Sequence, residues 1–137
     1  MRHGNWLILA LIPGFQFAHA AACPDAKAAE EATDHLHSWN NVYRFFKIYG
    51  NCFDASVAEG AEDKIQLLWA DRWSTLPEMI GLTNKDRRFK KFIWLRIGDA
   101  TFPRDEFDRV VQHARSECPP GAIDFCHEVL KEAEKLQ

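Results

Sequence analysis

The sequence contains none of the short motifs that build a recognisable catalytic or nucleotide site. It has no G-x-S-x-G nucleophile turn, no H-E-x-x-H metal motif and no glycine-rich loop that could cradle a phosphate. Its four cysteines never occur as C-x-x-C, a spacing typical of zinc and redox sites. These absences disfavour the commonest enzyme classes, and we predict a non-enzymatic protein without a metal or cofactor.

Signals for β-structure, disorder and a strong overall charge are also scarce. No segment alternates apolar and polar residues, and no Asn-Gly dipeptide marks a hairpin. With 7 Gly, 6 Pro and 47% hydrophobic residues in 137, the chain is neither low-complexity nor disordered. A formal charge of −3 provides no general attraction to nucleic acid. The length leaves room for one domain.

The long hydrophobic run of a membrane span is missing, and a shorter apolar run stands at the N-terminus. Arg2 precedes an apolar stretch from Trp6 to Phe17, and small residues follow from Ala18 to Ala22. This three-part order is typical of a secretory signal peptide, whereas roughly 20 apolar residues are needed to span a bilayer. We therefore predict a cleaved signal over residues 1–22, no transmembrane span after cleavage, and a single helical domain over residues 23–137 that is periplasmic or secreted.

All four cysteines belong to the predicted mature chain. An even number of cysteines in an exported protein is typical of disulfides, here two. Cys118 and Cys126 flank the strong turn signal Pro119-Pro120-Gly121. We therefore predict that these two cysteines pair with each other.

A disulfide between the remaining cysteines, Cys23 and Cys52, can form only if the chain between them folds back. An unbroken helix between them would be ~36 Å long, whereas bridged Cα atoms lie within ~7 Å. The bridge therefore requires a break near His37-Ser38, where Ser38 can cap a second helix; otherwise the two bridges pair crosswise. Lipidation of Cys23 is a less favoured alternative, because Ala20 stands where a lipid-attachment motif has a branched residue.

Apolar residues recur at steps of three and four through the rest of the chain, which is the helical period. We predict an all-α fold, a single compact bundle of five to seven short helices stapled by the two disulfides. A short helix is expected over residues 77–81, and Thr83 with Asp86 resembles a capping arrangement for the helix after it. The inward residues of the last helix are expected to be Ile123, Cys126, Leu130 and Ala133.

The strongest local signal is a cluster of cations in a predicted helix. If its apolar residues face the core, the cations spread over the outer face. A cationic helix on a mature chain of net charge −4 (16 basic and 20 acidic side chains once Arg2 is lost) can orient an acidic partner. The plainer interpretation is a solvated helix face. The predicted partner-binding cations are Lys85, Arg87, Arg88, Lys90, Lys91 and Arg96.

Two tryptophans complete the candidate partner-binding site. Trp69 and Trp73 are four residues apart, so on one helix they lie along the same edge. Large aromatic residues most often pack in cores, but they also anchor interfaces.

Other residues have side chains that could bind a metal ion or take part in catalysis. They support an alternative function, a small periplasmic hydrolase or a metal-binding protein. His35 and His37 are two residues apart and would project ~200° apart on a helix, where they cannot share a metal ion. Carboxylates gather on the predicted helix that follows Cys52, where a solvated face is the plainer interpretation. The residues that such an alternative would use are Asp34, His35, His37, Asp54, Glu59, Glu62 and Asp63.

A resemblance to a known class of protein rests on the leader, on the Cys118-Pro119-Pro120-Gly121 turn before Cys126, and on the segment Cys52–Gly60. In architecture the mature chain resembles the small helical periplasmic immunity proteins of type VI secretion systems, and uncharacterised exported proteobacterial proteins. The former bind and block a cell-wall-degrading toxin. The resemblance implies a binding module whose partner is another protein, for example a secreted toxin, and not a nucleic acid. It assigns no functional residue.

The tripartite leader leads to a first prediction. We expect the mature protein to begin near Ala21 or Cys23 and to fractionate with the periplasm, because the small residues before these positions suit signal peptidase. N-terminal sequencing of the protein purified from each cell fraction measures this. An intact Met1 on cytoplasmic protein would contradict it.

Overall fold

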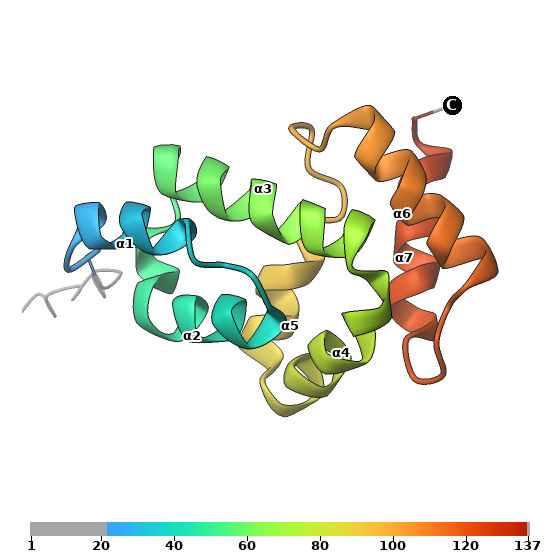
Figure 1. Ribbon diagram of the computed structural model, residues 1–137, viewed down its shortest axis with the longest axis horizontal. Coiled ribbons are helices and arrows are strands. Elements are labelled where there is room, and N and C mark those ends of the chain that lie inside the picture. Colours follow the sequence, from blue (N-terminus) through green and yellow to red (C-terminus); the bar gives the residue numbers. More distant parts are fainter. Residues whose placement is uncertain (1–21, 137) are drawn as a thin grey trace, which may run out of the picture.

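Helical periodicity, interrupted by capping residues and turns, divides the chain into short helices. The computed structural model describes residues 22–136, and within them the chain forms α-helices and two 3-10 turns but no strand (Figure 1). The helices are α1 (Ala26–Thr33), α2 (Trp39–Tyr49), α3 (Ala55–Asp71), α4 (Leu76–Lys85), α5 (Arg87–Trp94), α6 (Arg104–Ser116) and α7 (Ile123–Glu134), and the 3-10 turns are η1 (Gly50–Cys52) and η2 (Trp73–Thr75). The predicted all-α fold is confirmed. The predicted signal lies, except for its last residue, outside the described residues.

A side-chain cap separates the first two helices. The Ser38 hydroxyl oxygen accepts a hydrogen bond from the Asn41 backbone N–H at 3.2 Å, and this bond starts α2. Asp25 starts α1 in the same way, through the Ala28 N–H at 2.9 Å. The predicted break near His37-Ser38 is therefore confirmed.

The break lets the chain fold back, so that both predicted disulfides form. Cys23 and Cys52 are bonded with their Cα atoms 4.6 Å apart. Cys118 and Cys126 are bonded with their Cα atoms 6.2 Å apart. The crosswise pairing is not adopted, and the sulfur of Cys23 is held in a disulfide with no free thiol to carry a lipid.

The helices pack in two groups joined by α3. Figure 1 shows α1 and α2 at one end, α3 running along the molecule, α4 and α5 beneath it, and α6 with α7 at the other end. Helices α1 and α3 approach closely at Gly60, where an added Cβ would lie 2.8 Å from the hydroxyl oxygen of Thr33. This contact explains a glycine within a helix, where it otherwise costs about 1 kcal/mol relative to alanine.

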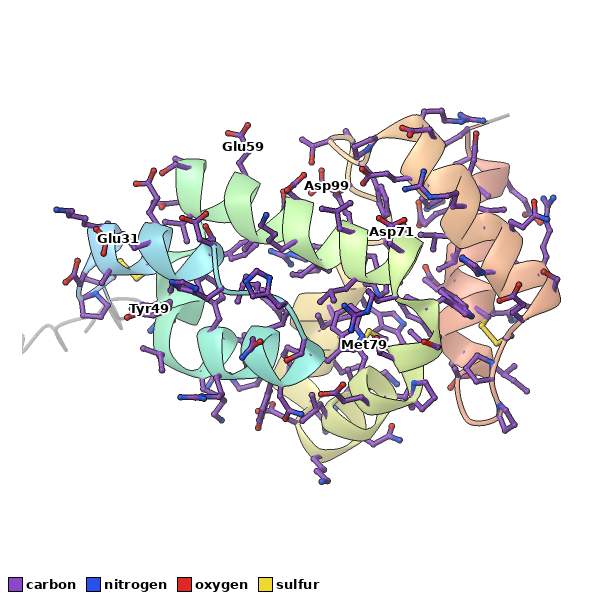
Figure 2. The ribbon with its side chains drawn as sticks, viewed as in Figure 1. Glu31, Tyr49, Glu59, Asp71, Met79 and Asp99 are labelled. Carbon is purple, nitrogen blue, oxygen red and sulfur yellow. A yellow bond between two sulfur atoms is a disulfide. The ribbon has the colours of Figure 1, made fainter. Side chains whose placement is uncertain are left out.

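The two groups share one aromatic core centred on Trp69 of α3. Its ring centroid lies 6.0 Å from that of Trp39 on α2, 6.1 Å from Phe102 and 5.4 Å from Phe125 on α7. Its indole N–H points at the sulfur of Met79 on α4, 3.2 Å away. Met79 is labelled in Figure 2. One side chain thus contacts three other helices and the segment before α6.

Two local predictions are wrong. Thr83 caps no helix: it lies inside α4, which extends to Lys85, and its buried hydroxyl donates to the Ile80 carbonyl at 3.0 Å. Ile123 is 68% exposed, because the face of α7 that meets the rest of the protein is built from Phe125, Val129 and their neighbours. Two sets of positions in α7 have helical spacing, and only packing against α6 selects between them.

The disulfides should contribute unequally to stability. They close loops of 29 and 8 residues, for which loop-closure entropy gives about 3.6 and about 2.5 kcal/mol respectively. Replacing Cys23 and Cys52 by alanine should therefore lower the free energy of unfolding by about 1 kcal/mol more than replacing Cys118 and Cys126. Urea unfolding of both double variants measures the difference, and an equal or reversed order would contradict the loop-length argument.

Candidate functional site: the basic face of α5

Helix α5, which carries most of the predicted cations, begins at Asp86. One carboxylate oxygen of Asp86 accepts hydrogen bonds from the backbone N–H groups of Arg88 at 2.9 Å and Phe89 at 3.1 Å. The other accepts from the Tyr43 hydroxyl at 3.2 Å and from the Lys47 ammonium at 3.3 Å, both on α2. Asp86 therefore caps α5 and also holds it against α2.

These donors keep the cap ionised. The pKa of the Asp86 carboxyl is lowered from its ordinary value, chiefly because the Phe89 N–H donates to the carboxylate, with Lys47, the Arg88 N–H and Tyr43 acting in the same direction. A carboxyl whose pKa is lowered by folding stabilises the fold above its unfolded-state pKa. That stabilisation is lost as the pH falls through the folded-state pKa.

Four residues on one side of α5 extend into solvent. At 3.6 residues per turn, the positions of Arg87, Arg88, Lys91 and Leu95 fall within about 100° of the helix circumference. All four side chains are exposed, Leu95 by 63%. Within residues 22–136 the three cations take part in no ion pair. We call this set the basic face of α5.

Two further predicted cations lie beside the basic face. Lys85 is the exposed last residue of α4. Lys90 is half-buried, and its ammonium lies 4.9 Å from the centroid of the Trp94 ring, a cation–π contact. Lys85 extends the positive surface, whereas the charge of Lys90 is partly engaged by the protein itself.

The prediction that Arg96 contributes to a partner-binding surface is wrong. Its side chain is only 11% exposed, and its guanidinium lies between the rings of Phe53 and Phe92, 4.2 and 4.3 Å from their centroids. It donates to the Phe92 carbonyl at 2.7 Å, and its Nε lies 3.7 Å from a carboxylate oxygen of Glu62 on α3. Helical spacing also separates Arg96 from the exposed cations, because it lies four residues after Phe92 and seven after Phe89, on the buried side of α5.

Arg96 belongs to an internal network of three charges. Burial raises the pKa of the Glu62 carboxyl, and Asp99 raises it further, against the opposing effect of Arg96. Burial lowers the pKa of the Arg96 guanidinium, while Glu62 and Asp99 act to raise it. Burial is the largest influence on Asp99 and acts to raise its pKa. Donation from the Thr101 N–H and hydroxyl at 2.8 and 2.7 Å, together with Glu62 and Arg96, outweighs burial, so that this pKa is lowered. The network ties α3 to the segment after α5.

The two predicted tryptophans are also unavailable to a partner. Trp69 and Trp73 are only 1% and 6% exposed, so their assignment to the partner-binding surface is wrong. They share no helix edge, because α3 ends between them and Trp73 lies in η2. The Trp73 ring stacks on His113 with centroids 5.3 Å apart, and its N–H donates to the Glu117 carbonyl at 3.0 Å.

A groove of about 650 Å³ between α1 and α3 carries the opposite charge. Lys27 lines it together with five carboxylates, those of Glu30, Glu31, Asp34, Glu59 and Asp63 (Glu31 and Glu59 are labelled in Figure 2). Positive charge on α5 and negative charge on the α1–α3 side make the molecule dipolar.

Of the residues named for the alternative function, Asp34, Glu59 and Asp63 line the α1–α3 groove, but the two histidines are not arranged as metal ligands. The rings of His35 and His37 lie at right angles with their centroids 6.4 Å apart. Across the part of the chain that the structure describes, no group of three or more His, Cys, Asp or Glu side chains could hold a metal ion.

One member of the basic face was missed by the sequence analysis. Leu95 follows Lys91 by four residues and Arg88 by seven, so helical spacing alone places it among the cations. The sequence signal for Leu95 is an apolar residue on a side of the helix where the other residues are charged.

Comparison with known proteins identifies no relative. No protein-family model matches the chain, and neither a curated protein nor a solved structure matches it significantly. Within residues 22–136, none of the helices combines the length and the apolar character that crossing a membrane requires.

Removing the Asp86 side chain should destabilise α5. We expect Asp86→Ala to lower the free energy of unfolding at pH 7 by about 0.5–2 kcal/mol, the range for loss of a helix N-cap. The deficit relative to the wild type should shrink as the pH falls below about 4, since protonation removes the contribution of the carboxylate in the wild type. Urea unfolding at several pH values measures both effects.

Asp54→Ala is the matched control, because Asp54 occupies the N-cap position of α3 but accepts no capping hydrogen bond. Equal losses for the two variants, or a deficit at Asp86 that is independent of pH, would contradict the proposed anchoring.

Proposed function

We propose that this protein is an exported binding module that captures an acidic partner protein through the basic face of α5. The observation that carries the proposal is the set of three exposed cations without ion-pair partners within residues 22–136, followed one turn beyond Lys91 by the exposed Leu95. Cations of this kind steer association with an acidic surface, and an apolar side chain among them offers an anchor for the bound state.

The position of these cations supports a role beyond solubility. Arg87 and Arg88 occupy the first turn of α5, where the helix dipole favours negative charge and each cation costs about 0.3–1 kcal/mol. A helix selected only for stability and solubility would carry Asp or Glu there. Cations retained against the dipole are understandable if a partner uses them.

The two disulfides support export, because disulfides form and persist in oxidising compartments. Within such a compartment, the resemblance to immunity proteins suggests a cell-wall-directed toxin as the partner. Enzymes that cleave glycans carry paired carboxylates across a cleft. A basic helix with a protruding leucine is complementary to an acidic cleft of this kind, and in this proposal the protein blocks the cleft by occupying it.

Charge reversal on α5 should separate stability from binding. We expect Arg87→Glu, Arg88→Glu and Lys91→Glu together to leave the helical content unchanged and, through the first two positions, to favour α5. The same variant should capture the partner at least tenfold more slowly, on the order of 1.4 kcal/mol. Circular dichroism and the association rate at low salt measure the two effects.

The control carries the same change in net charge at exposed cations outside the basic face: Lys27→Glu, Arg72→Glu and Lys131→Glu. A photo-crosslinking residue in place of Leu95 should attach to the captured protein, whereas one in place of the equally exposed Ile123 should not. If both triple variants capture the partner at the wild-type rate, the cations of α5 only solvate the helix.

A further inference from the structure

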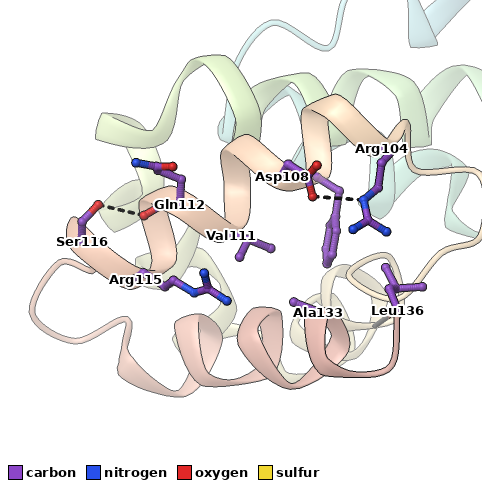
Figure 3. Close-up of a pocket in the computed structure, with 9 residues that line it drawn as sticks. Arg104, Asp108, Val111, Gln112, Arg115, Ser116, Ala133 and Leu136 are labelled. Carbon is purple, nitrogen blue, oxygen red and sulfur yellow. Dashed lines mark hydrogen bonds and ion pairs between the residues drawn. The ribbon is translucent and has the colours of Figure 1, made fainter.

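A second surface, formed by residues other than those of the basic face, lies between α6 and α7. A groove of about 480 Å³ runs along the junction of these helices (Figure 3). This volume falls within the range of about 300–1,000 Å³ that is usual for small-molecule sites. The disulfide between Cys118 and Cys126 closes the turn that joins the two helices, so their relative position is fixed covalently at one end.

The groove has an apolar floor between polar edges, which are formed by Arg104, Asp108, Gln112, Arg115 and Ser116. Phe107 and Val111 of α6 and Ala133 of α7 form the floor and are at most 9% exposed. Leu136, beyond the end of α7, is 56% exposed and forms part of the wall. A second hollow of about 260 Å³, to which Ile97 and Phe102 contribute, shares Arg104, Phe107 and Leu136 with the groove. The apolar surface therefore continues past the end of the groove.

An arginine stands at each end of the groove, and the two differ in their partners. Arg104 and Arg115 are separated by three turns of α6, about 16 Å. Arg104 is paired with Asp108 at 3.1 Å. Arg115 forms no ion pair with any residue between 22 and 136, and its guanidinium lies between the two helices in Figure 3. The unmatched positive charge of the groove is therefore at the Arg115 end.

We propose that this groove binds a linear acyl chain with a single anionic head group. The head lies at Arg115, and the chain runs over Val111, Ala133 and Leu136 toward the hollow beside Phe102. The opposite orientation is disfavoured because Asp108 already neutralises Arg104 and because Asp99 and Glu132 line the hollow.

An extended peptide fits the same groove less well. The backbone groups of α6 and α7 are bonded within their own helices. Asp108 is paired with Arg104 and the Ser116 hydroxyl donates to the Gln112 carbonyl, so few partners remain for the amides of a bound strand. Amides without partners are costly to remove from water. A methylene chain has no such groups, and each methylene it buries strengthens binding roughly fourfold.

The test uses dodecanoate below its micelle concentration as the probe and heteronuclear NMR on the full mature protein as the readout. We expect saturable shifts of the Val111, Ala133 and Leu136 methyl signals. Arg115→Glu should weaken binding tenfold or more, and Leu136→Asp should do the same. Both residues are exposed, so neither variant should disturb the fold. Arg72→Glu, an equal charge change outside the groove, should leave the affinity within twofold.

The chemistry of the probe separates the two parts of the site. Dodecanol lacks the charge and octanoate lacks part of the chain, so both should bind at least tenfold more weakly than dodecanoate. Equal binding of dodecanoate and dodecyltrimethylammonium, or shifts centred on residues outside the groove, would overturn the proposal. An affinity for dodecanoate that Arg115→Glu leaves unchanged would do so as well.

Discussion

The indole of Trp69 is the contact on which the arrangement of the helices depends. It is rooted in α3, and it meets α2, α4, α7 and the segment that leads into α6. A buried aromatic side chain of this size removes a large apolar area from water, and here that area is shared by elements from both ends of the molecule. The basic helix α5 is placed indirectly, by packing on α4 and by the bonds of Asp86 to α2. Its outward face is free because Phe89 and Ile93 fill its inner face.

Features that depend on neighbouring residues in the chain could be predicted from the sequence. The helical period, the cap at Ser38 and the disulfide across the Pro-Pro-Gly turn are of this kind. Features that depend on where a helix stops could not. Trp73 follows the end of α3, so helical spacing assigned it to an edge that it does not occupy. Arg96 was grouped with the cations by its charge and its nearness in the chain, although its spacing from Phe89 and Phe92 matches the buried side of α5. The burial of Trp69 could not be predicted for a different reason, because protein cores and binding interfaces are both rich in tryptophan.

Two kinds of arginine, more than two helical turns apart, illustrate how burial decides the role of a charge. Arg96 has lost most of its water and is compensated by two aromatic rings, a backbone carbonyl and two carboxylates. Its removal would leave Glu62 and Asp99 as buried neighbours of like charge, so its role in the fold is structural. Arg87 and Arg88 keep their water and are paired with no residue of the described chain, at the helix end where cations are least favourable. Their charges are free to act on another molecule.

The segment from Leu95 to Phe102 connects the two proposed binding surfaces. Leu95 belongs to the basic face, Arg96 points into the charge network, and Ile97 and Phe102 line the hollow that continues the α6–α7 groove. Asp99 belongs to both the network and the hollow. An acyl chain in the hollow and a protein on α5 would thus contact the two ends of one short segment. If the acyl chain changes the affinity for the protein partner, the protein partner must change the affinity for the acyl chain by the same factor. The segment is held in place by the same Arg96 contacts that remove this cation from the surface.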